Sequence, residues 1–181
     1  DANYRYANAS RNMSSSGQYI LLGSPKLKEE DIPAETIRDQ AKTDDVAVVV
    51  IGRHAGEGAD RNVEDDFELS EVERNLICRV SRAYHAEGKK VIVILNIGGV
   101  IETASWKNQV DAIILPWSPG QEGANAIAQV HKGEINPSGK LPMTFPVNYM
   151  DHLSSRNFPD EYSRFLQSNR RRSRTAVKDI D

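Results

Sequence analysis

The chain has 181 residues, 39% of them hydrophobic, with a formal net charge of −3 and a single cysteine. This length is that of one ordinary globular domain, and the near-neutral charge argues against nucleic acid or an anionic membrane as a partner. One cysteine excludes an internal disulfide, and no apolar run approaches the ~20 residues that cross a bilayer. The composition therefore predicts a globular domain with neither a nucleic-acid nor a membrane partner.

The two ends of the chain differ from its middle. Residues 1–28 show no sustained period and predict an irregular leading segment, while residues 29–150 carry the periodic pattern of a domain. Residues 151–181 form a polar, basic tail or truncated linker, and its basic cluster at Ser168–Arg174 has no interleaved aromatic residue to stack on bases. Since the chain begins at Asp1 and not at Met, we expect it to be a piece of a longer protein.

Two elements are predicted in the first part of the domain. Ile32-Pro33 marks a helix start, and Ile37 and Ala41 lie four residues apart, as on one face of a helix. A β-branched run follows at residues 46–51 and ends at Gly52. Uninterrupted apolar runs of this length are typical of strands buried on both faces of a parallel sheet.

The next helix is predicted to begin at Ser70. Ser70 and Glu73 have the spacing of a capping box, in which two side chains satisfy free backbone amides reciprocally, and Gly88 is placed to end the helix. Its apolar stripe consists of Val72, Leu76, Val80 and Ala83. A second buried strand is predicted over residues 91–95.

Helices and strands continue to alternate in the second half of the domain. A short helix around residues 101–107 leads to a strand at 112–115, and a helix spans 120–132. Residues 139–145 predict an edge strand because Pro142 cannot donate to a sheet. The inward residues of the helix at 120–132 are Ala124, Ile127 and Ala128, and Gly133 ends it. This alternation predicts an open, mostly parallel α/β sheet with helices on both faces, and about four strands suggest an incomplete copy of the domain.

The most unusual stretch follows the first strand. Gly56 and Gly58 bracket Glu57 in a loop just past the strand, where ligands gather in open α/β sheets. The neighbouring charged residues that could hold this loop or tune the proton affinity of Glu57 are Arg53, His54, Asp60 and Arg61. A solvated loop and a phosphate cradle are the alternatives, although the glycine spacing does not match G-x-G-x-x-G.

Metal and cofactor sites have no support in the sequence. The four histidines are scattered, and no Cys/His cluster has metal-ligand spacing, so neither a metal nor a cofactor is predicted. Asn96 and Glu122 lie near predicted strand ends, where ligand contact and helix capping are both open roles. Trp106 and Trp117 are candidates for stacking on a ligand ring, with a core role favoured for Trp106.

Several segments together resemble the second domain of family 3 glycoside hydrolases. The strand and loop at residues 48–61 resemble the family element "GR-x-SGEG-x-DR", and residues 66–70 resemble "DF-x-LS". Residues 95–106 resemble "LN-x-G-x-P-x-E…SW". The closing motifs "PGQEG" and "NPSGKLP-x-TFP" are matched by residues 119–123 and 136–146. The likeness covers roughly residues 30–150 with all elements in order.

This resemblance implies a flavodoxin-like α/β sandwich beside a barrel domain, with the active site at their interface. It implies a retaining β-glycosidase, active on terminal β-linked glucosides or oligosaccharides, with Glu57 as acid/base and an aspartate nucleophile on the missing N-terminal barrel domain. Ala55 replaces the usual serine of the motif, which puts local hydrogen bonding in doubt. The family also implies a periplasmic or extracellular location and an isolated fragment without activity. The alternative is a non-catalytic, flavodoxin-like module that binds a small ligand.

Overall fold

The computed structural model describes residues 29–53 and 61–157. The chain divides into two compact units, Asp1–Phe145 and Pro146–Asp181. The predicted leading segment at residues 1–28 and most of the predicted tail lie outside the described residues. In the second unit, two short 3₁₀ helices span Tyr149–Asp151 and Leu153–Asn157.

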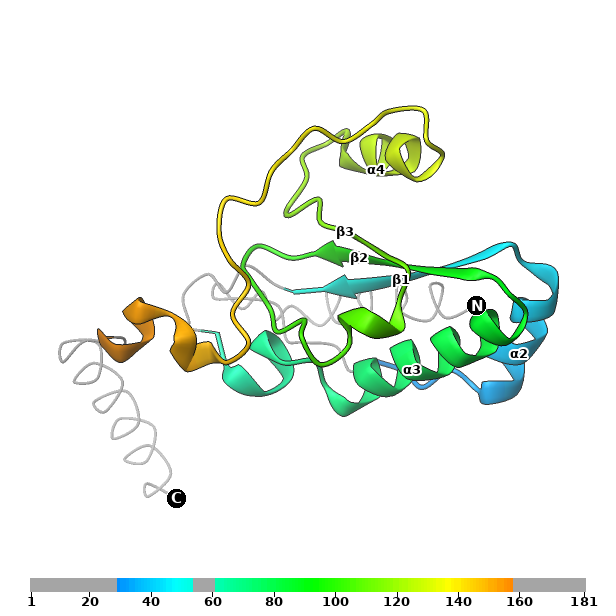
Figure 1. Cartoon of the computed structure of the whole chain (residues 1–181), viewed down its shortest axis with the longest axis horizontal. Helices are drawn as coiled ribbons and strands as arrows, with labels where there is room; N and C mark the ends of the chain where they lie inside the picture. Colours follow the sequence, from blue (N-terminus) through cyan, green and yellow to red (C-terminus); the bar gives the residue numbers. More distant parts are fainter. Residues whose placement is uncertain (1–28, 54–60, 158–181) are drawn as a thin grey trace, which may run out of the picture. The chain divides into compact units, whose positions relative to one another are not determined.

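The first unit is built on a parallel sheet (Figure 1). Its strands are β1 (Val46–Gly52), β2 (Lys90–Asn96) and β3 (Ala112–Ile114), in the order β1-β2-β3. Val49 lies opposite Val93, and Ile92 lies opposite Ala112. The predicted fold class, an open parallel α/β sheet with helices, is confirmed, because each β-branched run became a strand and the intervening residues cross over.

Among the described residues, three α-helices accompany the strands: α2 (Ala34–Thr43), α3 (Glu71–Ala86) and α4 (Gly123–His131). The predicted capping box at the start of α3 is confirmed, since the Ser70 Oγ accepts from the Glu73 amide at 3.3 Å and Glu73 Oε2 accepts from the Ser70 amide at 2.8 Å. Gly88, just past α3, has φ 69, a left-handed conformation that favours glycine. No helix among the described residues is long and apolar enough to cross a bilayer.

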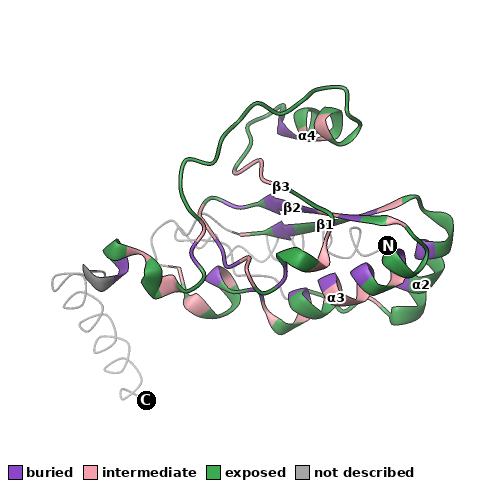
Figure 2. Cartoon of the chain, in the orientation of Figure 1, coloured by how far each residue is buried: buried purple, intermediate pink, exposed green. Residues whose placement is uncertain are grey.

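One face of the sheet packs against α2 and α3 (Figure 2). Alternate residues of β1 and β2 point into this core, and Ile37 and Ala41 of α2 lie within it as predicted. Residues on the other face are more open, with Val48 42% and Val50 60% exposed. The strand and helix residues of the core are Ala47, Val49, Ile51, Val91, Val93, Leu95, Ile77, Val80 and Tyr84.

The predicted apolar stripe of α3 is confirmed in part, since Val80 is buried and Leu76 and Ala83 pack partly buried against the core. The buried positions of the helix are Glu73, Ile77, Val80, Ser81 and Tyr84, while Val72 and Leu76 are only partly buried. The buried face of the helix also includes Glu73, whose carboxylate binds the buried Arg53. A hydrophobic stripe read from sequence cannot anticipate a carboxylate that belongs to the interior.

Two predicted elements are absent from the described residues. The expected helix at 101–107 is a turn followed by a 3₁₀ helix, Lys107–Gln109, because Glu102 accepts from the amide and hydroxyl of Ser105 and so tightens the chain locally. The expected edge strand at 139–145 is irregular, with Leu141 63% exposed.

Helix α4 forms close to its predicted bounds, but the prediction of its inward face is wrong. Ala124 and Ala128 are exposed and Ile127 is only partly buried. Gly123 is the one residue of the helix that is buried, and it lies so close to Pro119 that a Cβ there would be 2.3 Å from the proline side chain. Gly133 closes α4 with φ 74, as expected from its position.

Candidate functional site

The candidate site begins where β1 ends. Arg53 follows the last residue of the strand, and its amide still donates to the Asn96 carbonyl at 3.1 Å. Of the predicted site residues, Glu57, His54 and Asp60 lie outside the described residues. Arg53 and Arg61 are described, and they stand at the two ends of the loop that carries Glu57.

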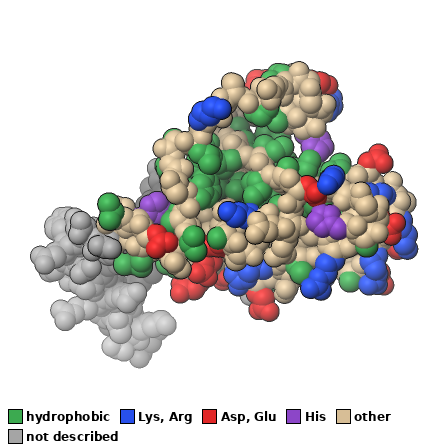
Figure 3. Space-filling view, viewed as in Figure 1, with side chains coloured by type: hydrophobic (Ala, Val, Ile, Leu, Met, Phe, Trp, Pro, Cys, Tyr) green, Lys and Arg blue, Asp and Glu red, His purple; other side chains and the backbone are tan. Residues whose placement is uncertain are grey.

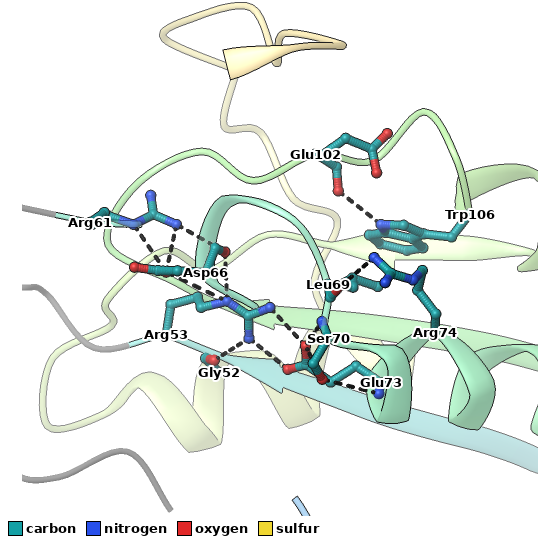
Figure 4. Close-up of polar contacts among 10 residues, drawn as sticks. All are labelled: Gly52, Arg53, Arg61, Asp66, Leu69, Ser70, Glu73, Arg74, Glu102 and Trp106. Atoms are coloured by element: carbon teal, nitrogen blue, oxygen red, sulfur yellow. Dashed lines mark hydrogen bonds and ion pairs between the residues drawn. The ribbon is translucent and has the colours of Figure 1, made fainter. Parts of the chain in front are cut away.

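The Arg53 side chain is only 2% exposed, and each of its three nitrogens donates a hydrogen bond (Figure 4). Its two terminal nitrogens donate to the two carboxylate oxygens of Glu73 at 2.6 and 2.9 Å. Its Nε donates to the Asp66 carbonyl at 2.8 Å, and Nη1 also reaches the Gly52 carbonyl at 2.7 Å. This bidentate geometry with additional carbonyl acceptors is the arrangement in which a buried guanidinium is tolerated.

Glu73 joins this arginine to the start of α3. The same carboxylate accepts from the Ser70 amide and hydroxyl at 2.8 and 3.0 Å. Burial opposes its ionisation, but hydrogen bonds from Arg53 and Ser70 outweigh burial and hold the Glu73 pKa below its usual value. Glu73 therefore stays ionised and fixes the end of β1 against the first turn of α3.

Arg61, at the far end of the loop, binds a different carboxylate. Its Nε and Nη2 donate to Asp66 Oδ1 at 3.1 and 3.0 Å, and Nη2 lies 3.3 Å from the Asp66 carbonyl. Its Nη1 donates to the Val100 carbonyl at 2.9 Å. Both Arg61 and Asp66 are 24% exposed, so this pair lies at the edge of the core.

A kinked turn, η1 (Val63–Phe67), presents Asp66 to both arginines. Within it Glu64 is extended and Asp65 has φ 59, a left-handed conformation that aspartate tolerates better than most residues. The turn is tied to the segment after β2, because the Glu102 amide donates to the Phe67 carbonyl at 2.7 Å.

The tryptophans and strand-end residues have structural contacts. Trp106 is 1% exposed and its indole donates to the Glu102 carbonyl at 2.8 Å, which confirms the favoured core role. The Trp117 ring packs at a centroid distance of 6.0 Å on Phe145, and its backbone has φ 58. Glu122 accepts from Asn125 at 2.6 Å at the start of α4, and Asn96 is exposed at the end of β2.

Other parts of the described chain do not offer a competing site. A groove of about 370 Å³ lies between α2 and the second half of α3, at the amino ends of the strands and away from the loop. The described residues hold no group of three or more His, Cys, Asp or Glu positioned to bind a metal ion. The candidate site is therefore the end of β1, where the described Arg53 and Arg61 flank residues 54–60.

Sequence reasoning identified the arginines but missed the carboxylates that bind them. Asp66 and Glu73 fall in local sequence patterns that mark the start of a helix, and the sequence analysis assigns them only that role. Their second role depends on contacts with Arg53, 13 and 20 residues away in the chain. A surplus of charged residues flanking a buried strand was the one signal that could have pointed to them.

Comparison with known proteins identifies relatives of this domain. β-Glucosidase A of Butyrivibrio fibrisolvens is 31% identical over 170 residues, covering 80% of this chain and 20% of the relative. The periplasmic β-glucosidase of Salmonella typhimurium is 36% identical over 121 residues, covering 64% of this chain and 15% of the relative. The chain therefore spans about a fifth or less of the length of these relatives.

Solved structures agree with the sequence comparison. β-Glucosidase 3B of Thermotoga neapolitana in complex with glucose superposes with a TM-score of 0.76 at 46% identity, covering 88% of this chain and 22% of that one. A β-glucosidase of Paenibacillus barengoltzii superposes with a TM-score of 0.69 at 26% identity, covering 87% and 18%. The model of the glycosyl hydrolase family 3 C-terminal domain matches residues 6–176, and the chain belongs to this family.

Proposed function

We propose that this chain is the second domain of a retaining β-glucosidase and supplies its acid/base, Glu57. The observation that carries the proposal is the family match over residues 6–176, within which the loop at 53–61 has the motif of the family's acid/base glutamate. Anchored residues on both sides of this loop, Arg53 and Arg61, support a role that requires a defined position.

The proposed chemistry needs two carboxyl groups on the two sides of a glycosidic bond. One carboxylic acid protonates the leaving oxygen and returns as the base that activates water, while the other forms a covalent glycosyl-enzyme intermediate. In retaining enzymes these groups lie about 5–5.5 Å apart. Glu57 would take the first role and an aspartate of the preceding barrel domain the second, so the isolated chain should be inactive.

His54 and Asp60 belong to the proposal as residues that hold the loop and tune the proton affinity of Glu57. An acid that starts the cycle protonated needs a raised pKa, which burial against the partner domain and the sugar would provide. Arg53 and Arg61 would limit this effect little, because their charges are already matched by Glu73 and Asp66.

The proposed substrate is a terminal β-linked glucoside or oligosaccharide. The relatives' names and the glucose complex of the Thermotoga neapolitana enzyme support a glycone of this kind. A periplasmic or extracellular location is proposed for the same reason, since the Salmonella typhimurium relative is named as periplasmic.

The test compares Glu57→Ala with the wild type in the full-length enzyme, on an aryl β-glucoside with a very good leaving group. Such a leaving group departs without protonation, so glycosylation survives while deglycosylation stalls for want of a base. Azide needs no base and should restore turnover as a glycosyl azide. Glu68→Ala, which removes an exposed carboxylate nearby, is the control and should behave like the wild type.

If Glu57→Ala turned over like the wild type with and without azide, Glu57 would be a loop residue. The non-catalytic ligand-binding module would then be the better account of the chain.

A further inference from the structure

The residues on the two sides of the loop at 54–60 are joined by Asp66, which follows the loop in sequence. Arg53 and Arg61, on the two sides of the loop, both donate to Asp66: Arg53 to the carbonyl at 2.8 Å, and Arg61 to the carboxylate at 3.0 and 3.1 Å. Figure 4 shows the two guanidinium groups converging on this residue. Asp66 thus fixes the separation between the ends of the loop.

The Asp66 carboxylate forms its shorter ion pair with Arg61 and not with Arg53. Arg53 has its own bidentate carboxylate in Glu73, whereas the ion pair of Arg53 Nε with Asp66 Oδ1 is longer, at 3.6 Å. Removing the Asp66 carboxylate would therefore take away the ion pair of Arg61 while leaving the buried Arg53–Glu73 pair intact.

Arg61 is also held from the opposite side. Its Nη1 donates to the Val100 carbonyl at 2.9 Å, and a Cβ placed on the adjacent Gly99 would lie 2.7 Å from the same nitrogen. Gly99 is not in the left-handed region, so a Cβ here would leave the backbone unstrained but would require the Arg61 guanidinium to shift. The absence of a side chain at Gly99 makes room for Arg61.

We propose that Asp66, Arg61 and Gly99 form a clamp that positions the loop bearing the acid/base, so that Asp66 is a positioning residue of the glycosidase reaction. The inference rests on the proposed function of Glu57 and adds residues outside the loop to it. Fixing both ends of a short loop reduces the conformations open to it. Since a displacement of about 1 Å can cost on the order of 10²-fold in rate, the clamp acts on catalysis without touching substrate.

Two variants of the full-length enzyme test the clamp from its two sides. Asp66→Asn removes the charge that binds Arg61, and Gly99→Ala displaces the guanidinium without removing any polar group. Asp111→Asn is the matched control, because Asp111 also accepts three hydrogen bonds but lies before β3, at the amino ends of the strands. Each variant is assayed on one aryl glucoside with a poor leaving group and one with a good leaving group.

A misplaced acid should slow only the substrate that needs protonation. Both clamp variants are expected to lower kcat/KM about 10- to 100-fold on the poor leaving group and less than about threefold on the good one, with azide restoring kcat on the latter. The control should keep the wild-type ratio between the two substrates. Asp66→Asn combined with Arg61→Met should be no worse than Arg61→Met alone, because the Asp66 carboxylate is proposed to act on the loop through Arg61.

The clamp is overturned if kcat/KM on both substrates stays within twofold of the wild type, or if it falls equally on both. An equal loss would indicate a general loss of folded enzyme. Glu57→Ala, assayed alongside, separates the two proposals. If Glu57→Ala loses activity on the poor leaving group and is rescued by azide on the good one, but the clamp variants show neither effect, only the clamp is overturned. Wild-type behaviour of Glu57→Ala overturns the proposed function and the clamp with it.

Discussion

Arg53 and Glu73 form the most buried ion pair described in the structure, with side chains 2% and 9% exposed. Taking two charges out of water is costly, and the pair is maintained by a bidentate contact and by hydrogen bonds to Ser70, Gly52 and Asp66. Removing one partner leaves the other as an unpaired charge in the interior.

Arg53→Met is therefore expected to lower the free energy of unfolding by about 3–5 kcal/mol, because Glu73 loses its partner. The double change Arg53→Met with Glu73→Gln should cost less than Arg53→Met alone, since no buried charge remains. Urea unfolding followed by circular dichroism measures both. A double variant less stable than Arg53→Met would show that the pair itself, and not the unpaired charge, is what the fold requires.

Two carboxylates should make the stability of the chain fall in acid. The pKa of Glu73 is lowered, and so is that of Asp111, which accepts from Lys90, His85 and the Val91 amide. Because each folded pKa lies below the unfolded value of about 4, the unfolded state binds more protons as pH falls, and the stabilisation present at neutral pH is lost below about pH 5. Unfolding midpoints measured from pH 7 to pH 3 should fall steeply for the wild type and less steeply for Glu73→Gln and Asp111→Asn. Parallel curves for all three proteins would contradict this assignment.

At the scale of elements, α3 shows why local signals are dependable. The Ser70–Glu73 capping box depends on residues three apart, so it forms in any context in which the helix forms. The same applies to Gly88 and Gly133, whose positive φ values end α3 and α4.

Ser70→Ala is expected to destabilise the chain by about 0.5–2 kcal/mol, through loss of the cap. Ser81→Ala, on the same helix, is the matched control, because the Ser81 hydroxyl is buried without a hydrogen-bond partner among the described residues. Its loss should be close to neutral. Equal effects of the two changes in thermal unfolding would show that the cap contributes nothing beyond the loss of a hydroxyl.

The predictions of two elements are wrong for different physical reasons. Residues 139–145 have the β-branched or apolar residues of an edge strand, but a strand exists only where another strand accepts its hydrogen bonds, and Leu141 and Met143 lie exposed. The segment at 101–107 was expected to be helical, yet Glu102 turns its side chain onto Ser105 and its carbonyl onto the Trp106 indole. The missing partner strand is not visible in a window of local sequence, whereas the Glu102 contacts are local and compete with the helix within four residues.

At the scale of the whole chain, the sheet has one face in the core and one that is more open. Figure 3 shows hydrophobic side chains gathered over the strands, with charged side chains along the margin over α2 and α3. Val49 and Val50 are neighbours in β1, but Val49 is 6% exposed and Val50 is 60% exposed. The side-chain alternation of a strand thus separates two residues that the sequence makes equivalent.

Val49→Lys is expected to unfold the chain or destabilise it by about 4 kcal/mol or more, because it buries an unpaired charge. Val50→Lys should cost about 1 kcal/mol or less, in line with a modest loss of β-propensity on an exposed face. Urea unfolding distinguishes the two. Comparable destabilisation by both changes would mean that the open face is covered in solution.

The amino-acid sequence by itself determined the alternation of strands and helices, the helix caps and the motif that places Glu57 between Arg53 and Arg61. These features depend on residue types and on spacings of a few positions, so a linear pattern contains them. The tertiary structure decided which face of each strand and of α3 is buried, and that Asp66 and Glu73 bind the two arginines. Those outcomes depend on contacts between residues that are far apart in the sequence. The free-energy cost of an unpaired charge or of an exposed apolar side chain depends on whether its position is buried, and only the tertiary structure decides that.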